Sequence, residues 1–259
     1  MESESERATR LAKEGLDAMD VGDNANARRL FEECMAIRQS LGDQIGVAKA
    51  LNLVANITIQ EGDEEGAKTL WGQSLEMQRA LNNLRGMHCP LANLSGAAYR
   101  AGDYVLLRDL EEQMVAVARA LDDSEYLAHS LDSLTQTAIF LQDYPYARRV
   151  QQESLAIKKA VDLREDMPSS LKLCAEVASA THDCERSAVF YGAYAKQCAL
   201  LARPQHLQEK EQLAADMAAL ESRMGEIPYK TAYSAGKLMT LEQAAEAATE
   251  FCATPTERK

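Results

Sequence analysis

Hydrophobic residues recur at helical spacing along most of the chain, and short polar steps interrupt the pattern at regular intervals. Between residues 41 and 81, the positions that share one helical face are Leu51, Val54, Ala55 and Thr58. The pattern stops at the pair Gly62-Asp63 and then resumes. It predicts one helix over about residues 44–60 and a second from about Glu64 to Leu81, with a short turn between them.

The aspartate of this turn returns every 40 residues. The repeated positions are Asp23, Asp63, Asp103, Asp143 and Asp183. A column of leucines and a column of small residues keep the same step. These columns are Leu11, Leu51, Leu91, Leu131 and Leu171, and Gly15, Ala55, Ser95, Thr135 and Ala175. Because the period is constant without insertion or deletion, the sequence predicts five equal repeats of two helices each.

The Gly-Asp pair has a physical role in such a turn. Glycine tolerates the left-handed backbone that closes a helix, and the following aspartate caps the next helix with its carboxylate. Gln142 and His182 replace the glycine in the last two repeats, which costs up to about 1 kcal/mol at each site. The pair is therefore predicted to be a turn between helices and not a ligand-binding loop.

The repeated segments "LNLVA", "GDEEGAKTLW" and "GDNANARRLF" resemble the tetratricopeptide repeat in a 40-residue variety. This resemblance implies an all-α fold, a right-handed α-solenoid of about five TPR-like helix pairs with capping helices at its C-terminal end. The expected repeats are about 7–41, 42–81, 82–121, 122–161 and 162–201. Residues 1–6 are expected to be disordered.

The segment after the repeats carries a second resemblance. "ERSAVFYGAYAKQCALL" and "MGEIPYKTAYSAGKLMTLEQAAEAATEF" resemble the end of the repeat region in large bacterial signal-transduction ATPases and LuxR-type, maltose-regulator-like activators. We expect Gly236 to end one helix, and Thr240 with Gln243 to form the capping box of the next. Residues 202–252 are then capping helices, and 253–259 a frayed tail.

The phosphate loop that the ATPases would require is missing from this sequence. "SAGKLMT" contains Gly-Lys but lacks the earlier glycine and the following Ser or Thr of a Gly-x-x-x-x-Gly-Lys-[Ser/Thr] motif. We therefore expect either a free-standing repeat protein or an excised regulatory piece.

Composition agrees with a folded helical protein. Of the 259 residues 46% are hydrophobic, which is ample for a core. The net charge of −12 disfavours direct binding to nucleic acid or to an anionic membrane surface. No apolar run approaches 18 residues, and the acidic start "MESESER" does not resemble a signal peptide, so a cytoplasmic protein is expected. The six cysteines form no Cys-x-x-Cys pair and are interpreted as small buried hydrophobes.

The sequence offers no convincing catalytic constellation. His88-Cys89 and His182-x-Cys184 lack the partners that a zinc site or a Cys-His dyad needs. The adjacent basic pairs Arg148-Arg149 and Lys158-Lys159 are interpreted as solvated helix faces. We predict that the protein is not an enzyme and that it has no catalytic residue, no cofactor and no metal site.

The inner surface of the expected solenoid is the more informative one, because the first helix of each repeat lines it. Its polar positions outside the core form the predicted groove. These residues are Lys49, Asn52, Asn56, Asn93, Arg100, His129, Asp132, Gln136, Lys172 and Glu176. An asparagine amide donates and accepts at once, so this set suits the backbone of an extended peptide.

Two functions follow from this prediction. The first is a protein–protein interaction scaffold that binds a peptide or partner segment in the concave groove. The second is a sensory or regulatory module that binds a small ligand or signalling peptide, within or alongside a bacterial transcription regulator or ATPase. A deep apolar pocket would favour the second function. The partner is expected to be a protein or peptide, and self-association stays open.

Overall fold

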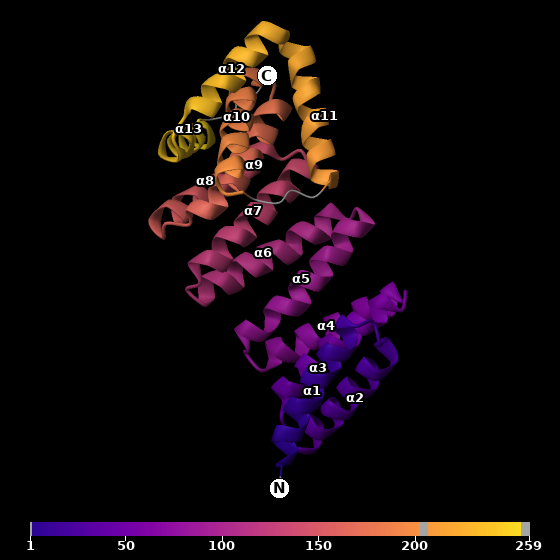
Figure 1. Ribbon diagram of the computed structural model, residues 1–259. Coiled ribbons are helices and arrows are strands. Elements are labelled where there is room, and N and C mark those ends of the chain that lie inside the picture. The colour runs from indigo at the N-terminus through magenta and orange to yellow at the C-terminus, as the bar shows by residue number, and fades with distance from the viewer. Residues whose placement is uncertain (1, 203–206, 255–259) are drawn as a thin grey trace. The chain divides into compact units, whose positions relative to one another are not determined.

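The structure, a computed structural model, describes residues 2–202 and 207–254, and these residues form helices and turns without a strand (Figure 1). The chain divides into two compact units between Leu121 and Asp122. The N-terminal unit contains α1 (Glu4–Asp20), α2 (Asn24–Ser40), α3 (Gln44–Gln60), α4 (Glu64–Ala80), α5 (Leu84–Ala101) and α6 (Tyr104–Ala120). These helices make three antiparallel pairs, so each repeat is one helical hairpin.

The C-terminal unit holds the last two repeats and the terminal helices. It contains α7 (Ser124–Phe140), α8 (Tyr144–Ala160), the short 3-10 helix η1 (Arg164–Asp166), α9 (Met167–Ala180), α10 (Cys184–Leu200), α11 (Leu207–Met224), α12 (Glu226–Leu238) and α13 (Leu241–Ala253). The helices predicted over 44–60 and from Glu64 to about Leu81 are confirmed by the bounds of α3 and α4.

One turn geometry recurs every 20 residues, at half the period seen in the sequence. The residues with a left-handed backbone are Gly22, Gly42, Gly62, Asn82, Gly102, Asp122, Gln142, Asp162, His182 and Ala202. The turn between two repeats is therefore built like the turn inside one. The sequence contained this signal at Gly42-Asp43, which repeats the Gly62-Asp63 pair half a period earlier.

Gly62-Asp63 shows how the turn satisfies both helix ends. Gly62 has φ of 91°, a conformation that glycine adopts without strain. The Asp63 N–H donates to the Thr58 carbonyl at 3.1 Å, and Asp63 Oδ1 accepts the Gly66 N–H at 2.9 Å. The predicted role of the pair, to end one helix and cap the next, is confirmed.

The N-terminus departs from the sequence prediction. Residues 1–6 were expected to be disordered, but α1 already begins at Glu4. Ser3 caps this helix by accepting the Glu6 N–H, and the Glu6 carboxylate accepts the Ser3 N–H at 2.8 Å. This reciprocal Ser-x-x-Glu arrangement stabilises the first turn. At the other end, α13 includes Ala253 and is followed by Thr254, while the rest of the expected frayed tail lies outside the described residues.

The terminal helices complete the core of the C-terminal unit. Tyr229 and Phe251 are buried in the same cluster as Leu171 and Phe190 of the last repeat. The Phe190 and Phe251 rings meet edge to face with centroids 5.4 Å apart. The apolar surface of the last repeat is thus covered by α12 and α13, as a solenoid end requires. Within the described residues, no helix is both long and apolar enough to cross a membrane.

Gly236 has a different role from the one expected. It was predicted to end a helix, but α12 continues through it to Leu238, and the left-handed conformation is absent there. A Cβ atom at this position would overlap with the Val189 carbonyl oxygen of α10, and one at Gly192 would overlap with the Tyr233 carbonyl of α12. The two glycines therefore permit close backbone contact between α10 and α12, which lie side by side (Figure 1).

We expect Gly236→Ala to destabilise the C-terminal unit by about 1–3 kcal/mol, because the added methyl group forces the two backbones apart. Gly72→Ala is the matched control, since nothing lies within 4 Å of a Cβ at that helical position. The control should be neutral or stabilising by up to about 1 kcal/mol. Urea unfolding followed by circular dichroism measures both, and equal effects would contradict the close-packing role.

Candidate functional site

The N-terminal unit brings three of the predicted groove residues together. Asn52 and Asn56 lie on α3 and Asn93 on the neighbouring first helix, α5. Asn93 Nδ2 donates to Asn52 Oδ1 at 3.3 Å and to Asn56 Oδ1 at 3.0 Å. The indole N–H of Trp71 donates to Asn56 Oδ1 at 2.9 Å. We call Asn52, Asn56 and Asn93 the amide cluster.

These contacts use only one end of each amide. Within the described part of the chain, the Nδ2 groups of Asn52 and Asn56 and the Oδ1 atom of Asn93 have no hydrogen-bond partner. None of the three is a buried unpaired atom, so each retains contact with solvent. The amide cluster thus holds two donor groups and one acceptor in fixed positions, although Asn52 as a whole is only 7% exposed.

Two exposed cations lie on the same first helices. Lys49 lies one turn before Asn52 on α3, and Arg100 lies near the end of α5. Arg100 is 3.7 Å from the Glu64 carboxylate, a partly exposed pair of little energetic weight. Tyr99, beside Arg100, is exposed and stacks edge to face with Tyr104, with ring centroids 6.4 Å apart. The N-terminal unit therefore offers amide, cationic and aromatic groups on α3 and α5.

In the C-terminal unit, Asp132 faces inward and makes a buried ion pair. Its carboxylate binds the Lys158 ammonium, which also donates to Ser170 Oγ at 2.8 Å and to the Asp166 carbonyl at 3.1 Å. Ser154 Oγ donates to Asp132 Oδ1 at 2.6 Å. The network joins α7, α8 and the start of α9. Asp132, predicted as a groove residue, therefore bonds to buried partners on its own side of the helix pair.

Each of the two basic pairs interpreted as solvated has one buried member, so that interpretation was wrong for Lys158 and Arg148. Lys158 has no exposed side chain, whereas Lys159 is exposed. Neighbouring residues on a helix point about 100° apart, so one of two lysines turns into the core. Arg148 is buried because α13 covers it. Its guanidinium lies 4.0 Å from the Phe251 ring centroid and donates to the Thr254 carbonyl at 2.9 Å.

The remaining predicted residues of this unit form two small contacts. His129 Nε2 lies 3.3 Å from Asp166 Oδ2. Gln136 Nε2 on α7 donates to Glu176 Oε2 on α9 at 3.1 Å, and the Lys172 ammonium lies 3.5 Å from the other Glu176 oxygen. Burial raises the pKa of Glu176 above its usual value, although Lys172 and Gln136 act in the opposite direction.

Helix α11 lies against this part of the C-terminal unit. Arg223 donates to the Ser179 carbonyl of α9 at 3.2 Å, and Leu220 is buried in the core. Burial, together with the nearby Glu176 and Asp216 carboxylates, raises the pKa of the Tyr191 phenol. Glu176 therefore faces groups from α7, α10 and α11 and is less accessible than a free groove residue.

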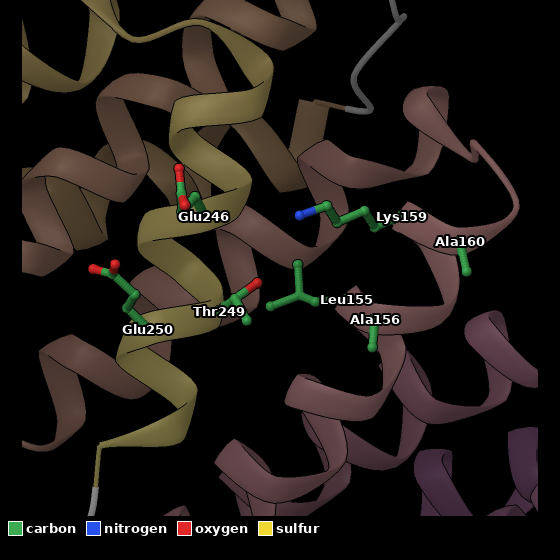
Figure 2. Close-up of a pocket in the computed structure, with 7 residues that line it drawn as sticks. All are labelled: Leu155, Ala156, Lys159, Ala160, Glu246, Thr249 and Glu250. Atoms are coloured by element: carbon green, nitrogen blue, oxygen red, sulfur yellow. The ribbon is translucent and has the colours of Figure 1, made fainter.

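An open cleft of about 460 Å³ lies between α8 and α13 of the same unit, and none of the ten predicted groove residues lines it. Its lining is Leu155, Ala156, Lys159, Ala160, Glu246, Thr249 and Glu250. Figure 2 shows Lys159 extending from α8 toward α13. The cleft is open and not enclosed, so it is not the deep apolar pocket that a small-ligand sensor would use.

The two His-Cys motifs gather no further metal-ligating side chains in the described part of the chain. His88 Nδ1 and Cys89 Sγ are 3.9 Å apart and exposed. His182 contacts Arg223 at 3.3 Å instead of Cys184. No group of three or more His, Cys, Asp or Glu side chains converges among the described residues.

Comparisons with solved structures identify the fold. The apo form of RapI is 10% identical and has a TM-score of 0.64, covering 96% of this chain and 75% of its own. A putative kinesin light chain with nearly identical TPR-like repeats from Podosopora anserina is 19% identical, with a TM-score of 0.54 and coverage of 87% and 100%. BtubC (BKLC) from P. vanneervenii is 12% identical, with a TM-score of 0.56 and coverage of 99% and 96%.

These similarities show an all-α fold of the TPR-like repeat type, which confirms the fold that the sequence predicted. No protein-family model matches the sequence, and no curated protein matches it significantly.

We expect Lys158→Met to lower the free energy of unfolding by about 3–5 kcal/mol, because it leaves the Asp132 carboxylate buried without its cation. Lys159→Met, one residue away and exposed, should change it by less than about 0.5 kcal/mol. Denaturant unfolding followed by circular dichroism compares the two variants. Similar small effects would mean that Lys158 is solvated after all.

A second prediction concerns pH. Folding raises the pKa of Glu176, so the protonated carboxyl group favours the folded state. Its contribution to the free energy of unfolding is present below the unfolded-state pKa of about 4.5 and is lost as the pH rises through the folded-state pKa. Glu176→Gln should therefore be more stable than the wild type at neutral pH, and the difference should vanish in acid. The control is Glu246→Gln on the exposed side of α13, which should show no such pH-dependent difference.

Proposed function

We propose that the protein is a protein–protein interaction scaffold that binds an extended peptide or partner segment along the first helices of its repeats. In the N-terminal unit the proposed site is the amide cluster on α3 and α5, with Lys49 and Arg100 beside it. In the C-terminal unit it is the polar side of α7 and α9, where His129, Gln136 and Lys172 lie.

The orientation of the amide cluster is the observation that supports this proposal most strongly. Trp71 and Asn93 hold the Asn56 amide so that its oxygen faces inward and its NH2 group is left for another acceptor. An extended peptide presents alternating N–H and C=O groups, which match two fixed donors and one fixed acceptor. Because the side chains are already ordered, binding costs little additional conformational entropy.

In the C-terminal unit we assign the predicted residues two different roles. His129, Gln136 and Lys172 are proposed to contact the partner. Asp132 and Glu176 are proposed to position them, since Asp132 binds the buried Lys158 and Glu176 accepts from Gln136 and pairs with Lys172.

The second candidate is a regulatory module within or alongside a bacterial transcription regulator or ATPase. Its support is the C-terminal segment, in which Gly236 packs against α10 and Thr240 with Gln243 forms the expected capping box. The α8–α13 cleft is open and not enclosed, so it would bury little of a small effector. We therefore favour the interaction scaffold. A signalling peptide bound at the proposed site would be consistent with both the scaffold and the regulatory module.

A displayed library of random peptides, selected on the wild-type protein, tests the proposed site without a known partner. The double variant Asn52→Ala, Asn93→Ala should lose at least about tenfold in affinity for the selected peptides, since each lost hydrogen bond is worth about 1 kcal/mol. This variant retains the bond between Asn56 and Trp71.

The matched control is Gln39→Ala, Gln73→Ala, which removes two exposed amides from the second helices α2 and α4. Calorimetric titration should give wild-type affinity for this control. If the Asn variant binds normally, or if both variants lose binding equally, the amide cluster is not the site.

A further inference from the structure

Two cysteines far apart in the sequence meet in the core of the C-terminal unit. Cys174 lies in the middle of α9 and Cys252 in the last turn of α13, and their sulfur atoms are 3.8 Å apart. Both side chains are buried, with 0% and 6% of Cys174 and Cys252 exposed. The interpretation of the cysteines as buried hydrophobes fits both, but nothing in the local sequence indicated that they are neighbours.

The separation of the two sulfur atoms suits a reversible covalent bond. A disulfide bond is about 2.05 Å long, so the two sulfur atoms need to approach each other by about 2 Å. The bond would connect α9 directly to α13, the helix that covers the core beside Phe190.

Arg148 gives Cys252 an electropositive surrounding. Its buried guanidinium lies over the Phe251 ring and donates to the Thr254 carbonyl, one residue before Cys252 and two residues after it. Arg148 forms no ion pair with a carboxylate among the described residues, and its Nε atom is buried without a partner. The thiolate form of cysteine is the nucleophile in oxidation by a peroxide.

The two sulfurs differ in access. Cys252 lies two residues before the helix cap Thr254, and the last turn of a helix opens more readily than its middle. Cys174 lies within α9 and is enclosed on all sides; the contact with Cys252 and burial raise its pKa well above the usual value. A small oxidant therefore reaches the Cys252 sulfur first, and the Cys174 sulfur reacts in the second step.

We propose that Cys174 and Cys252 are a peroxide-oxidisable pair that forms an intrachain disulfide and fastens α13 onto α9. The Cys252 thiolate attacks a hydroperoxide oxygen; a sulfur–oxygen bond forms, the oxygen–oxygen bond breaks, and the oxygen that leaves takes up a proton as water or an alcohol. The Cys174 sulfur then attacks the Cys252 sulfenic acid, the disulfide forms, and the hydroxyl leaves as water with the thiol proton. Two thiols lose two electrons, and the peroxide gains them.

The bond would close a loop of chain from Cys174 to Cys252 that contains α10, α11 and α12. Constraining a loop of this length lowers the entropy of the unfolded chain considerably. Oxidation would therefore make the C-terminal unit more resistant to unfolding without altering the amide cluster, which belongs to the other unit.

The experiment treats the full-length reduced protein with hydrogen peroxide, blocks free thiols by alkylation, and maps the peptides by mass spectrometry without reduction. We expect one intrachain cross-link between Cys174 and Cys252 that dithiothreitol reverses. Three results would overturn the proposal. Both cysteines could remain open to alkylation after peroxide treatment, Cys252 could become a sulfinic acid without a cross-link, or the main cross-link could involve other cysteines.

Thermal unfolding provides the second measurement. Peroxide should raise the melting temperature of the wild type by about 10 °C, and reductant should reverse the shift. The Cys252→Ser variant should show no shift, whereas Cys198→Ser, which removes a partly exposed cysteine of α10, should behave like the wild type. An equal shift in the Cys252→Ser variant would contradict the proposal, and the peptide map of the wild type decides the matter if that variant does not fold.

Discussion

The repeats depend on one constraint: most successive helices must satisfy their terminal peptide groups within a turn of only two or three residues. The left-handed residue returns every 20 positions, and an aspartate or asparagine after it caps most of the helices that follow. Because this turn fixes the helix length, equivalent positions of successive repeats stay in register. That register places Asn93 of one repeat beside Asn52 and Asn56 of the repeat before it. The turns thus determine the position of the amide cluster, although none of its residues lies in a turn.

Polar side chains between helices have two different consequences in the two units. In the N-terminal unit the amides bond to one another and keep unused donors and an acceptor in contact with solvent. In the C-terminal unit the Asp132–Lys158 pair is buried and bonded on several sides, so it fixes the packing of three helices. Asn52 and Asp132 occupy the same position of the 40-residue repeat, so one helical position carries a half-paired amide in one unit and a fully paired carboxylate in the other.

The sequence predicted the helices closely, because caps and apolar spacing are local signals. It selected Asn52, Asn56 and Asn93 as polar positions of the first helices, but it did not predict that their amides bond to one another. It did not predict which member of a basic pair is buried. Lys158 shares its 40-residue column with Gln78 and Ala118, which the structure also shows to be buried. The burial of Arg148 and the contact of Cys252 with Cys174 were not detectable from the sequence, because α13 packs against helices far from it in the sequence.

The central claim is that the half-paired amides bind the backbone of an extended peptide. Side-chain NH2 resonances in a ¹⁵N-correlated NMR spectrum report on these groups individually during titration with a selected peptide. The claim predicts that the Asn52 and Asn56 signals shift in proportion to occupancy while those of the exposed Gln39 and Gln73 do not move. Unchanged Asn52 and Asn56 signals at saturating peptide would contradict it.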